Sequence, residues 1–227
     1  MLFNSYFFIL VFLPVVVAGF FLLGRSGRAT WALLWLIGAS LLFYGLRNPW
    51  FVTVLIGSIL LNYCWGIAVG RGSKTLLAIG IAANLGLLGY FKYANFFVDN
   101  LTVATGFSFE LSPVVLPLAI SFYTFQQISY LVDIYHGKIR EHDFLHYCLF
   151  VTFFFFLIQG PIVYYNEFTP QFAEKEVFRF NPRMVAAGIT IFFFGLFKKV
   201  IFADGLAIYE SGVRDPPAYA IPRRVHA

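Results

Sequence analysis

Charged residues are scarce in this chain. Asp, Glu, Lys and Arg make up 12% of its 227 residues, whereas a soluble domain carries about 25%. This shortage argues against a water-soluble globular protein and favours an integral membrane protein. The net charge is +5, but the positive residues are scattered and form no basic run or zinc-finger spacing. Nucleic acid is therefore not an expected partner.

The chain also has few cysteines and no recognisable motif for a catalytic nucleophile. The two cysteines, Cys64 and Cys148, lie inside apolar runs, where a thiol behaves as a small hydrophobe. We therefore expect neither a disulfide nor a metal site. The sequence has no Gly-x-Ser-x-Gly elbow and no cysteine paired with a base, so it offers no evident nucleophile.

No Lys or Arg precedes the first apolar run, which argues against a secretory signal peptide. The first positive residues, Arg25 and Arg28, follow that run. Because positive loops tend to stay on the cytoplasmic side of a membrane, we expect a retained first span whose N-terminus lies outside.

Long apolar runs dominate the sequence. Hydrophobic residues make up 60% of it, aromatic residues 21%, and the mean hydropathy is +0.78. Four runs come close to the roughly 20 apolar residues that a helix needs to cross a bilayer: residues 5–24, 30–46, 50–69 and 75–98. The expected fold class is therefore all-α, a polytopic transmembrane helical protein. Residues 99–115 are mixed in composition and predict an exposed loop.

Residues 116–138 form an apolar stretch that carries a stripe of polar side chains. Spacings of three, four and three residues place four of them on one helix face: Tyr123, Gln126, Tyr130 and Asp133. Lipid cannot satisfy amides, phenols and a carboxylate, so the stripe should face other helices or a wet cavity. Two interpretations stay open: a functional site, or hydrogen bonds that merely join helices.

Loop charges support this order of spans. If the N-terminus lies outside, the loops on the inner side carry most of the positive residues, as the positive-inside rule requires. These residues are Arg25, Arg28, Arg71, Lys74, Lys138 and Arg140. The intervening outer loops carry Arg47 alone before residue 115. Four spans and the helix in residues 116–138 therefore cross in alternation.

Residues 144–165 break this pattern, because a full crossing would place Lys175, Arg179 and Arg183 outside. We therefore predict a re-entrant segment that turns back at Gly160-Pro161, with its non-helical backbone buried in protein or facing water. Residues 185–203 form a last apolar segment. Residues 205–227 contain adjacent prolines and no apolar run, so we expect a disordered tail after one membrane domain of residues 1–204.

Several motifs resemble those of the membrane-bound O-acyltransferase family, and most closely its bacterial alginate O-acetylation branch. They occur in order between Leu2 and about Asp204, and include KYANFF (92–97), LPLAISFYTFQQ (116–127), YLVD (130–133), GPIV (160–163) and GLFKK (195–199). Residues 1–204 thus resemble the N-terminal part of such a domain, and residues 205–227 do not fit it.

The resemblance implies a multi-pass acetyltransferase of the bacterial inner membrane, with its N-terminus in the periplasm. Such proteins surround a tunnel, hold no bound cofactor, and take the acyl group from acetyl-CoA or another acyl carrier. They pass it to hydroxyls of an exported polysaccharide, alginate or similar, through periplasmic partner proteins. We expect the polar stripe and one later amide to line the substrate tunnel: Tyr123, Gln126, Gln127, Tyr130, Asp133 and Gln159.

Two departures from the family pattern bear on activity. The family's catalytic histidine lies beyond the GLFKK motif, in a region that this sequence does not reach, so we expect a truncated form with no catalytic residue of its own. His136, His142 and His146 are expected to be loop or interface histidines. Residues 153–161 read FFFFLIQGP, where the family has FFPQLIAGP. The alternative functions are a non-catalytic membrane subunit, or a channel or carrier for polysaccharide modification.

Overall fold

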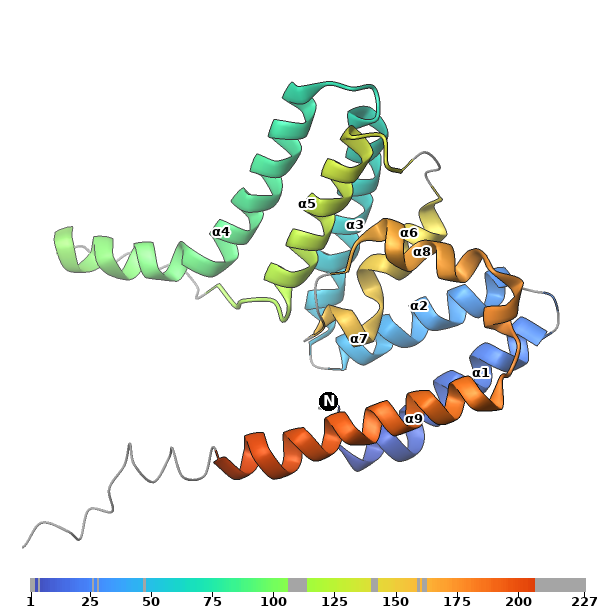
Figure 1. Cartoon of the computed structure of the whole chain (residues 1–227). Coiled ribbons are helices and arrows are strands. Elements are labelled where there is room, and N and C mark those ends of the chain that lie inside the picture. The colour runs from blue at the N-terminus through green and yellow to red at the C-terminus, as the bar shows by residue number, and fades with distance from the viewer. Residues whose placement is uncertain are drawn as a thin grey trace, which may run out of the picture. The chain divides into compact units, whose positions relative to one another are not determined.

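The computed structural model describes residues 3, 5–25, 27, 29–46, 48–105, 114–139, 143–158, 160 and 163–206, and these ranges contain helices and no strand (Figure 1). The helices before residue 140 are α1 (Leu13–Arg25), continued backwards by a π-helical turn at Phe8–Phe12, then α2 (Ala29–Gly45), α3 (Pro49–Val69), α4 (Lys74–Thr105) and α5 (Ile120–Tyr135). Those after it are α6 (Phe144–Thr152), α7 (Phe154–Leu157), α8 (Tyr165–Ala173), a 3-10 turn at Lys175–Phe178, α9 (Pro182–Phe197) and a π-helical turn at Lys198–Ala203.

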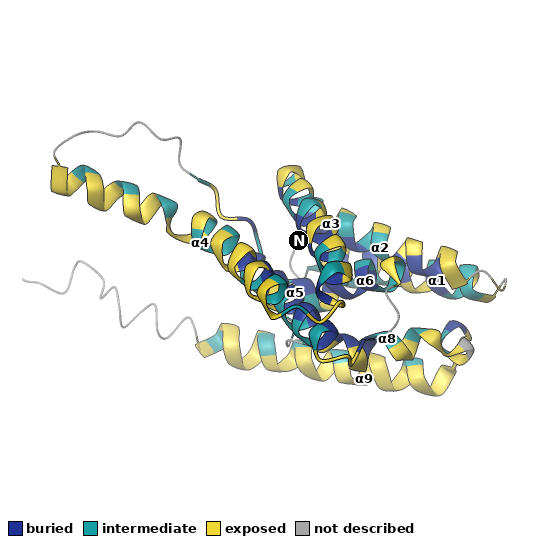
Figure 2. Cartoon of the chain, turned by 90° about the horizontal axis from the view of Figure 1, so that it is seen from above, coloured by how far each residue is buried: buried dark blue, intermediate teal, exposed yellow. Residues whose placement is uncertain are grey.

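Four helical segments are long and apolar enough to cross a membrane: Phe8–Arg25, Pro49–Val69, Lys74–Thr105 and Pro182–Leu206. The 17-residue α2 is also apolar. Many residues on these helices are exposed (Figure 2), and they include large apolar side chains such as Leu61 and Phe193. Exposed apolar helix faces of this extent suit lipid and not water. The expected all-α, multi-pass membrane protein is confirmed.

The chain divides into two compact units, one formed by Pro14–Arg179 and the other by Leu2–Leu13 with Phe180–Ala227. In the second unit the Phe8 ring lies 6.5 Å from the Phe192 ring, so the start of the chain packs against α9. In the first unit α5 packs against α3, α4 and α6, and α2 packs against α3 and α6. The single membrane domain expected for residues 1–204 stays a prediction.

Local capping residues decide where several helices begin. The Asn48 side chain accepts a hydrogen bond of 3.0 Å from the Trp50 backbone N–H, and Pro49 occupies the first turn of α3. Asn181 and Pro182 repeat this arrangement at α9. An Asn cap satisfies a free N–H of the first turn, and proline there has no N–H to satisfy. The Asn-Pro pairs therefore set these starts.

Two tryptophans fix neighbouring helices by the same device. The Trp35 indole N–H donates to the Val16 carbonyl at 3.0 Å, and the Trp65 indole donates to the Leu76 carbonyl at 2.8 Å. Each ring lies against a glycine of the accepting helix, Gly19 or Gly80. A β-carbon at Gly80 would stand 2.7 Å from Trp65 Cδ1. The missing side chain is what lets the indole reach the backbone.

The sequence-based boundaries were wrong in residues 99–105, which were expected to form a loop and instead extend α4. The polar side chains there turn back onto the helix: Asn100, Thr102 and Thr105 each donate to the carbonyl four residues earlier. This satisfies them without breaking the helix. Residues 106–113 lie outside the described residues.

The apolar segment 144–165 is interrupted earlier than expected. Phe153 leaves the helical conformation with ψ 113°, so α6 ends at Thr152 and the four-residue α7 follows. Neither helix has the roughly 20 residues that a crossing needs. Pro161 lies outside the described residues, so the re-entrant turn at Gly160-Pro161 stays a prediction.

The Trp65 contact predicts a strong effect of a small substitution. Gly80→Ala should lower the free energy of unfolding by about 1–3 kcal/mol, because the new methyl group must displace the indole. Gly86→Ala is the matched control on the same helix, since a β-carbon there meets nothing within 4 Å. Thermal unfolding of both variants in nanodiscs measures the difference. Equal midpoints for the two would contradict the packing described.

Candidate functional site

The candidate site is built on α5, and an anchored turn holds the start of this helix. Ala119 adopts a left-handed conformation with φ 62°, which is unfavourable for a residue that carries a β-carbon. Its carbonyl accepts hydrogen bonds from the backbone N–H groups of Phe122 and Tyr123. The Tyr44 hydroxyl of α2 donates to the Leu118 carbonyl at 2.7 Å. These bonds fix the position of the first turn of α5, and with it the position of Tyr123, the first residue of the polar stripe.

The polar stripe faces the interior of the helix bundle, as expected. Its side chains are 0–3% exposed: Tyr123, Gln126, Gln127, Tyr130 and Asp133. By contrast, Phe122 and Phe125 on the same helix are 39% and 45% exposed. This distribution, polar within and aromatic outside, is the one that lipid imposes. A role in lining a substrate tunnel stays a prediction, and Gln159 lies outside the described residues.

Gln127 belongs through its Oε1 to a cluster of hydrogen bonds between three helices. Its Oε1 accepts from the Ser58 hydroxyl at 2.6 Å and from Asn62 Nδ2 at 3.0 Å, both on α3. Asn62 and Asn84 of α4 exchange amide bonds of 3.1 and 2.6 Å. All four side chains are buried. For Gln127 the interpretation as a hydrogen bond that joins helices is therefore correct.

Sequence analysis missed Ser58, Asn62 and Asn84. The available signal was the spacing of Ser58 and Asn62, four residues apart on one face of a span that is otherwise apolar. The cluster also forms part of a groove of about 380 Å³ between α3 and α4, which is lined by Ser58, Asn62, Trp65, Asn84 and apolar neighbours.

Each of the five stripe residues carries a buried polar atom that has no hydrogen-bond partner among the described residues. These atoms are the hydroxyls of Tyr123 and Tyr130, Oε1 of Gln126, Nε2 of Gln127 and Oδ2 of Asp133. Buried polar groups in native proteins are nearly always bonded, so these atoms face something beyond the described side chains. Because Gln127 Oε1 is already bonded, the stripe is divided: Gln127 joins helices, and the remainder points to a functional site.

Aromatic rings enclose this face near its middle. The Tyr130 ring lies 4.2 Å from the Tyr147 ring of α6 and 5.3 Å from the Tyr165 ring of α8. Tyr130 also approaches α3 at Gly66, where a β-carbon would stand 3.1 Å from Tyr130 Cε1. Short helices after residue 143 therefore cover the polar face of α5 at this level.

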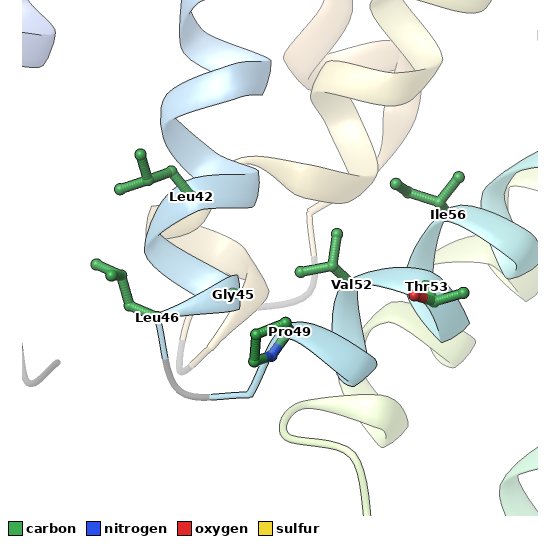
Figure 3. Close-up of a pocket in the computed structure, with 7 residues that line it drawn as sticks. All are labelled: Leu42, Gly45, Leu46, Pro49, Val52, Thr53 and Ile56. Atoms are coloured by element: carbon green, nitrogen blue, oxygen red, sulfur yellow. The ribbon is translucent and has the colours of Figure 1, made fainter.

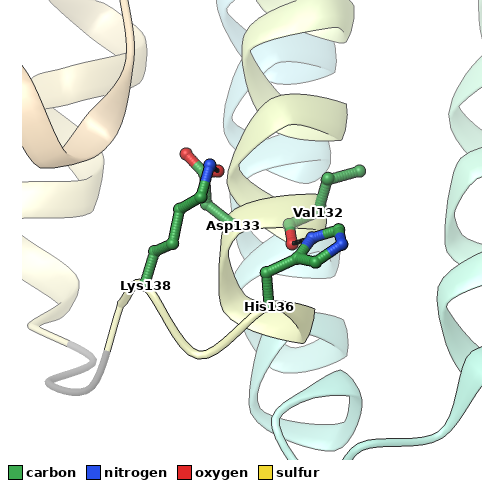
Figure 4. Close-up of polar contacts among 4 residues, drawn as sticks. All are labelled: Val132, Asp133, His136 and Lys138. Carbon is green, nitrogen blue, oxygen red and sulfur yellow. Dashed lines mark hydrogen bonds and ion pairs between the residues drawn. The ribbon is translucent and has the colours of Figure 1, made fainter.

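An ion pair closes the C-terminal end of the face. Lys138 Nζ lies 3.0 Å from Asp133 Oδ1, and the carboxylate is buried while the lysine side chain is 56% exposed (Figure 4). His136 turns away from this pair and its Nδ1 lies 2.8 Å from the Val132 carbonyl. Asp133 therefore offers one oxygen to Lys138 and keeps the other within the bundle.

A second carboxylate orients a histidine at the start of α6. Asp143 accepts from the Leu145 backbone N–H at 2.8 Å, and its other oxygen lies 2.6 Å from His146 Nδ1. Burial acts to raise the pKa of Asp143, but its bonds with His146 and Leu145 outweigh that effect and lower the pKa below its ordinary value. Asp143 thereby caps α6, and the interpretation of His146 as a loop or interface histidine stays a prediction. His142 and His226 lie outside the described residues.

A groove of about 510 Å³ lies where α2 and α3 meet, away from the polar face. It is lined by Leu42, Gly45, Leu46, Pro49, Val52, Thr53 and Ile56 (Figure 3). Thr53 provides the one side-chain hydroxyl in this lining, so the groove has little chemistry to offer a polar substrate. We place the candidate site on α5 instead.

The amide cluster yields a measurable coupling. Asn62→Ala and Asn84→Ala should each destabilise the protein, and the double variant should lose less than the sum, with a coupling of about 0.5–2 kcal/mol. Unfolding of the four proteins in nanodiscs completes this cycle. Asn100→Ala is the control, because Asn100 bonds only within its own helix. Strict additivity would contradict the exchange of bonds between α3 and α4.

Comparison with known proteins gives consistent results along most of the chain. No family model and no solved structure matches it. It is 40% identical to "Peptidoglycan O-acetyltransferase" of Helicobacter pylori, over 91% of the chain and 45% of that protein. It is 37% and 35% identical to "Probable alginate O-acetylase AlgI" of Pseudomonas aeruginosa and Pseudomonas putida, over 91% and 92% of the chain.

The chain spans less than half the length of these curated relatives, with 45%, 41% and 44% of each covered. The matches cover 91–92% of the chain, and they agree with the resemblance of the motifs and with the helical architecture. These matches confirm the resemblance of this chain to the membrane-bound O-acyltransferase family.

Proposed function

We propose that this chain forms part of a membrane O-acetyltransferase that modifies hydroxyl groups of an exported polysaccharide. The observation that carries this proposal is the similarity to proteins named for O-acetylation, at 32–40% identity over more than nine-tenths of the chain. Buried polar atoms on α5 support it, because a membrane helix with unsatisfied hydroxyl, amide and carboxylate groups points to a functional site.

The acceptor is proposed at the level of its chemistry. The relatives are named for peptidoglycan and for alginate, and both are carbohydrates with free hydroxyls. The transfer forms an ester bond between the acetyl carbon and the acceptor oxygen, and it breaks the bond to the donor sulfur. We propose acetyl-CoA or another acyl carrier as the donor, and periplasmic proteins as partners that present the polysaccharide.

The α5 residues have binding and positioning roles in this proposal. Tyrosine hydroxyls and the glutamine amide group supply donors and acceptors that can hold a hydroxyl or carbonyl group. Exclusion of bulk water by the surrounding helices protects a thioester from hydrolysis. No residue of this chain is assigned the role of base, which the family resemblance places on a histidine further along the family's sequence.

The proposed location is the bacterial inner membrane, with the N-terminus in the periplasm. The turn between α3 and α4 and the C-terminal end of α5 lie at one end of the bundle (Figure 1). Arg71, Lys74 and Lys138 are therefore gathered at that end, which the positive-inside rule assigns to the cytoplasm. The donor would reach the protein from this side.

Substitutions on the polar face test the proposed activity. Tyr123→Phe and Gln126→Ala, introduced into the chromosomal gene, should lower the ester-linked acetate of envelope polysaccharides about tenfold or more, because positioning interactions at a reacting centre carry factors of this size. Acetate released by mild alkali from peptidoglycan and from exopolysaccharide measures the loss and identifies the acceptor. Phe125→Leu, on the exposed side of α5, is the control. Acetylation at the unmutated level in both variants would remove the proposed role.

Labelling of single cysteines tests the orientation. In a protein with Cys64→Ser and Cys148→Ala, Val115→Cys should react with an impermeant maleimide added to intact spheroplasts, whereas Ser73→Cys should react only after lysis. The two positions lie in different loops, at the start of the α5 segment and between α3 and α4. The reverse pattern would place the N-terminus in the cytoplasm.

A further inference from the structure

Four of the five buried α5 side-chain atoms that lack a hydrogen-bond partner among the described residues lie in a row along the helix; the fifth is Nε2 of Gln127. The four atoms of the row belong to residues 123, 126, 130 and 133, so each follows the last by about one turn. At 1.5 Å per residue, the successive steps rise about 4.5, 6 and 4.5 Å, and the row extends about 15 Å. All four side chains are at most 3% exposed. The row therefore runs through the interior for half the thickness of a hydrocarbon core.

We propose that this row binds a single file of water molecules and conducts protons along α5. None of the four atoms is hydrogen-bonded to another of them, although a direct bond would need a separation of only about 2.7–3.2 Å. One bridging water makes two such bonds and spans about 5–6 Å, which is close to the backbone rise between successive residues of the row. The use of this path in catalysis rests on the proposed acetyl transfer, whereas the presence of the water molecules does not depend on it.

The chemistry of the four groups suits a relay. Tyr123 and Tyr130 have hydroxyls that both donate and accept, while Gln126 Oε1 and Asp133 Oδ2 accept. Hydroxyls thus alternate with acceptors, and an intervening water can donate to each. A column of this kind satisfies every buried polar atom of the row, as native proteins require.

The neighbouring residue shows why the row is separate from the helix-joining cluster. Gln127 Oε1 already accepts bonds from Ser58 and Asn62, and the Gln127 side chain also lies beside the Tyr147 hydroxyl. Its Nε2 has no partner among the described residues, but because Oε1 is occupied we assign Gln127 to the helix-joining cluster and not to the relay. Tyr44 provides a second contrast, because its buried hydroxyl is occupied by the Leu118 carbonyl.

The two ends of the row face different surroundings. Asp133 at one end is paired through its other oxygen with Lys138, whose ammonium group is largely exposed. Tyr123 at the opposite end follows the anchored turn at Leu118 and Ala119. The C-terminal end of α5, which Lys138 follows, lies at the same end as the turn between α3 and α4 (Figure 1), so the row leads toward the proposed cytoplasmic side.

Acetyl transfer supplies a proton for such a path. When the acceptor oxygen attacks the thioester carbon, the O–H bond breaks, an O–C bond forms, and the electron pair of the C–S bond leaves with sulfur. The thiolate then takes one proton, which balances the one lost by the acceptor hydroxyl. If the thiolate departs toward the inner side before it is protonated, the proton lost by the acceptor hydroxyl follows it inward. The row of α5 provides the route.

X-ray hydroxyl-radical footprinting of the whole chain in nanodiscs tests for the water file without requiring activity. Radiolysis of bound internal water should label Tyr123 and Tyr130 about tenfold faster than Tyr44, which is equally buried but has an occupied hydroxyl. This factor follows from the proximity of ordered water to the reacting ring. Equal labelling of the three tyrosines would overturn the proposal.

Interruption of the row tests proton conduction. Gln126→Leu should slow acetyl transfer about 100-fold, near the lower end of what positioned proton-transfer groups contribute, and should raise the solvent deuterium isotope effect on the maximal rate. Phe125→Leu should change neither quantity. Tyr130→Phe removes one hydroxyl with little change in packing, so it provides a second break if Gln126→Leu misfolds. Unchanged isotope effects in both row variants would overturn the conducting role.

The two proposals fail in different ways. If the unmutated protein in its native membrane transfers no acetyl group, the proposed function fails, and the footprinting comparison still decides whether the water file exists. If transfer occurs but Tyr123 and Tyr130 label no faster than Tyr44, the water file fails and the acetyltransferase stands.

Discussion

The inability of hydrocarbon to accept hydrogen bonds constrains this structure more than any other factor. A helix with an unsatisfied amide or carboxylate cannot face lipid without a cost of several kcal/mol per group. The polar stripe of α5 has five side chains that are buried: two tyrosines, two glutamines and one aspartate. This helix therefore has to be enclosed by other helices. The exchange of bonds between Asn62 and Asn84, with Gln127 attached, provides the dry part of that enclosure. The two tryptophan contacts add further bonds, one between α1 and α2 and one between α3 and α4.

Much of the architecture could be predicted from the sequence, because membrane helices have a simple requirement for length and hydrophobicity. The spans at residues 30–46 and 50–69 differ by one residue at most from α2 and α3. The polar stripe was recognised for a similar reason, since a spacing of three and four residues defines a face whatever surrounds it. The face points into the bundle because lipid cannot form hydrogen bonds with its polar groups.

The remaining features depend on partners that are distant in the sequence. Nothing in the local sequence distinguishes Gln127 from Gln126. Gln127 Oε1 nevertheless accepts hydrogen bonds from Ser58 and Asn62, whereas Gln126 Oε1 has no partner among the described residues. The interruption at Phe153 was also hidden in a run of four phenylalanines, which have no turn chemistry of their own. Residues 99–105 were misjudged because polar composition was taken as a sign of a loop, although their side chains bond to their own helix.

The 16-residue length of α5, together with its polar face, affects how the protein is made. A segment with this composition gains little from entering lipid alone, whereas α3 and α4 are long and apolar enough to cross a membrane. Since α3 and α4 precede α5 in the chain, they are already in the bilayer when α5 leaves the ribosome. Their amide groups then act as an intramolecular chaperone, because they offer the incoming helix the hydrogen bonds that lipid lacks. The order of the helices in the gene is thereby also the order of membrane assembly.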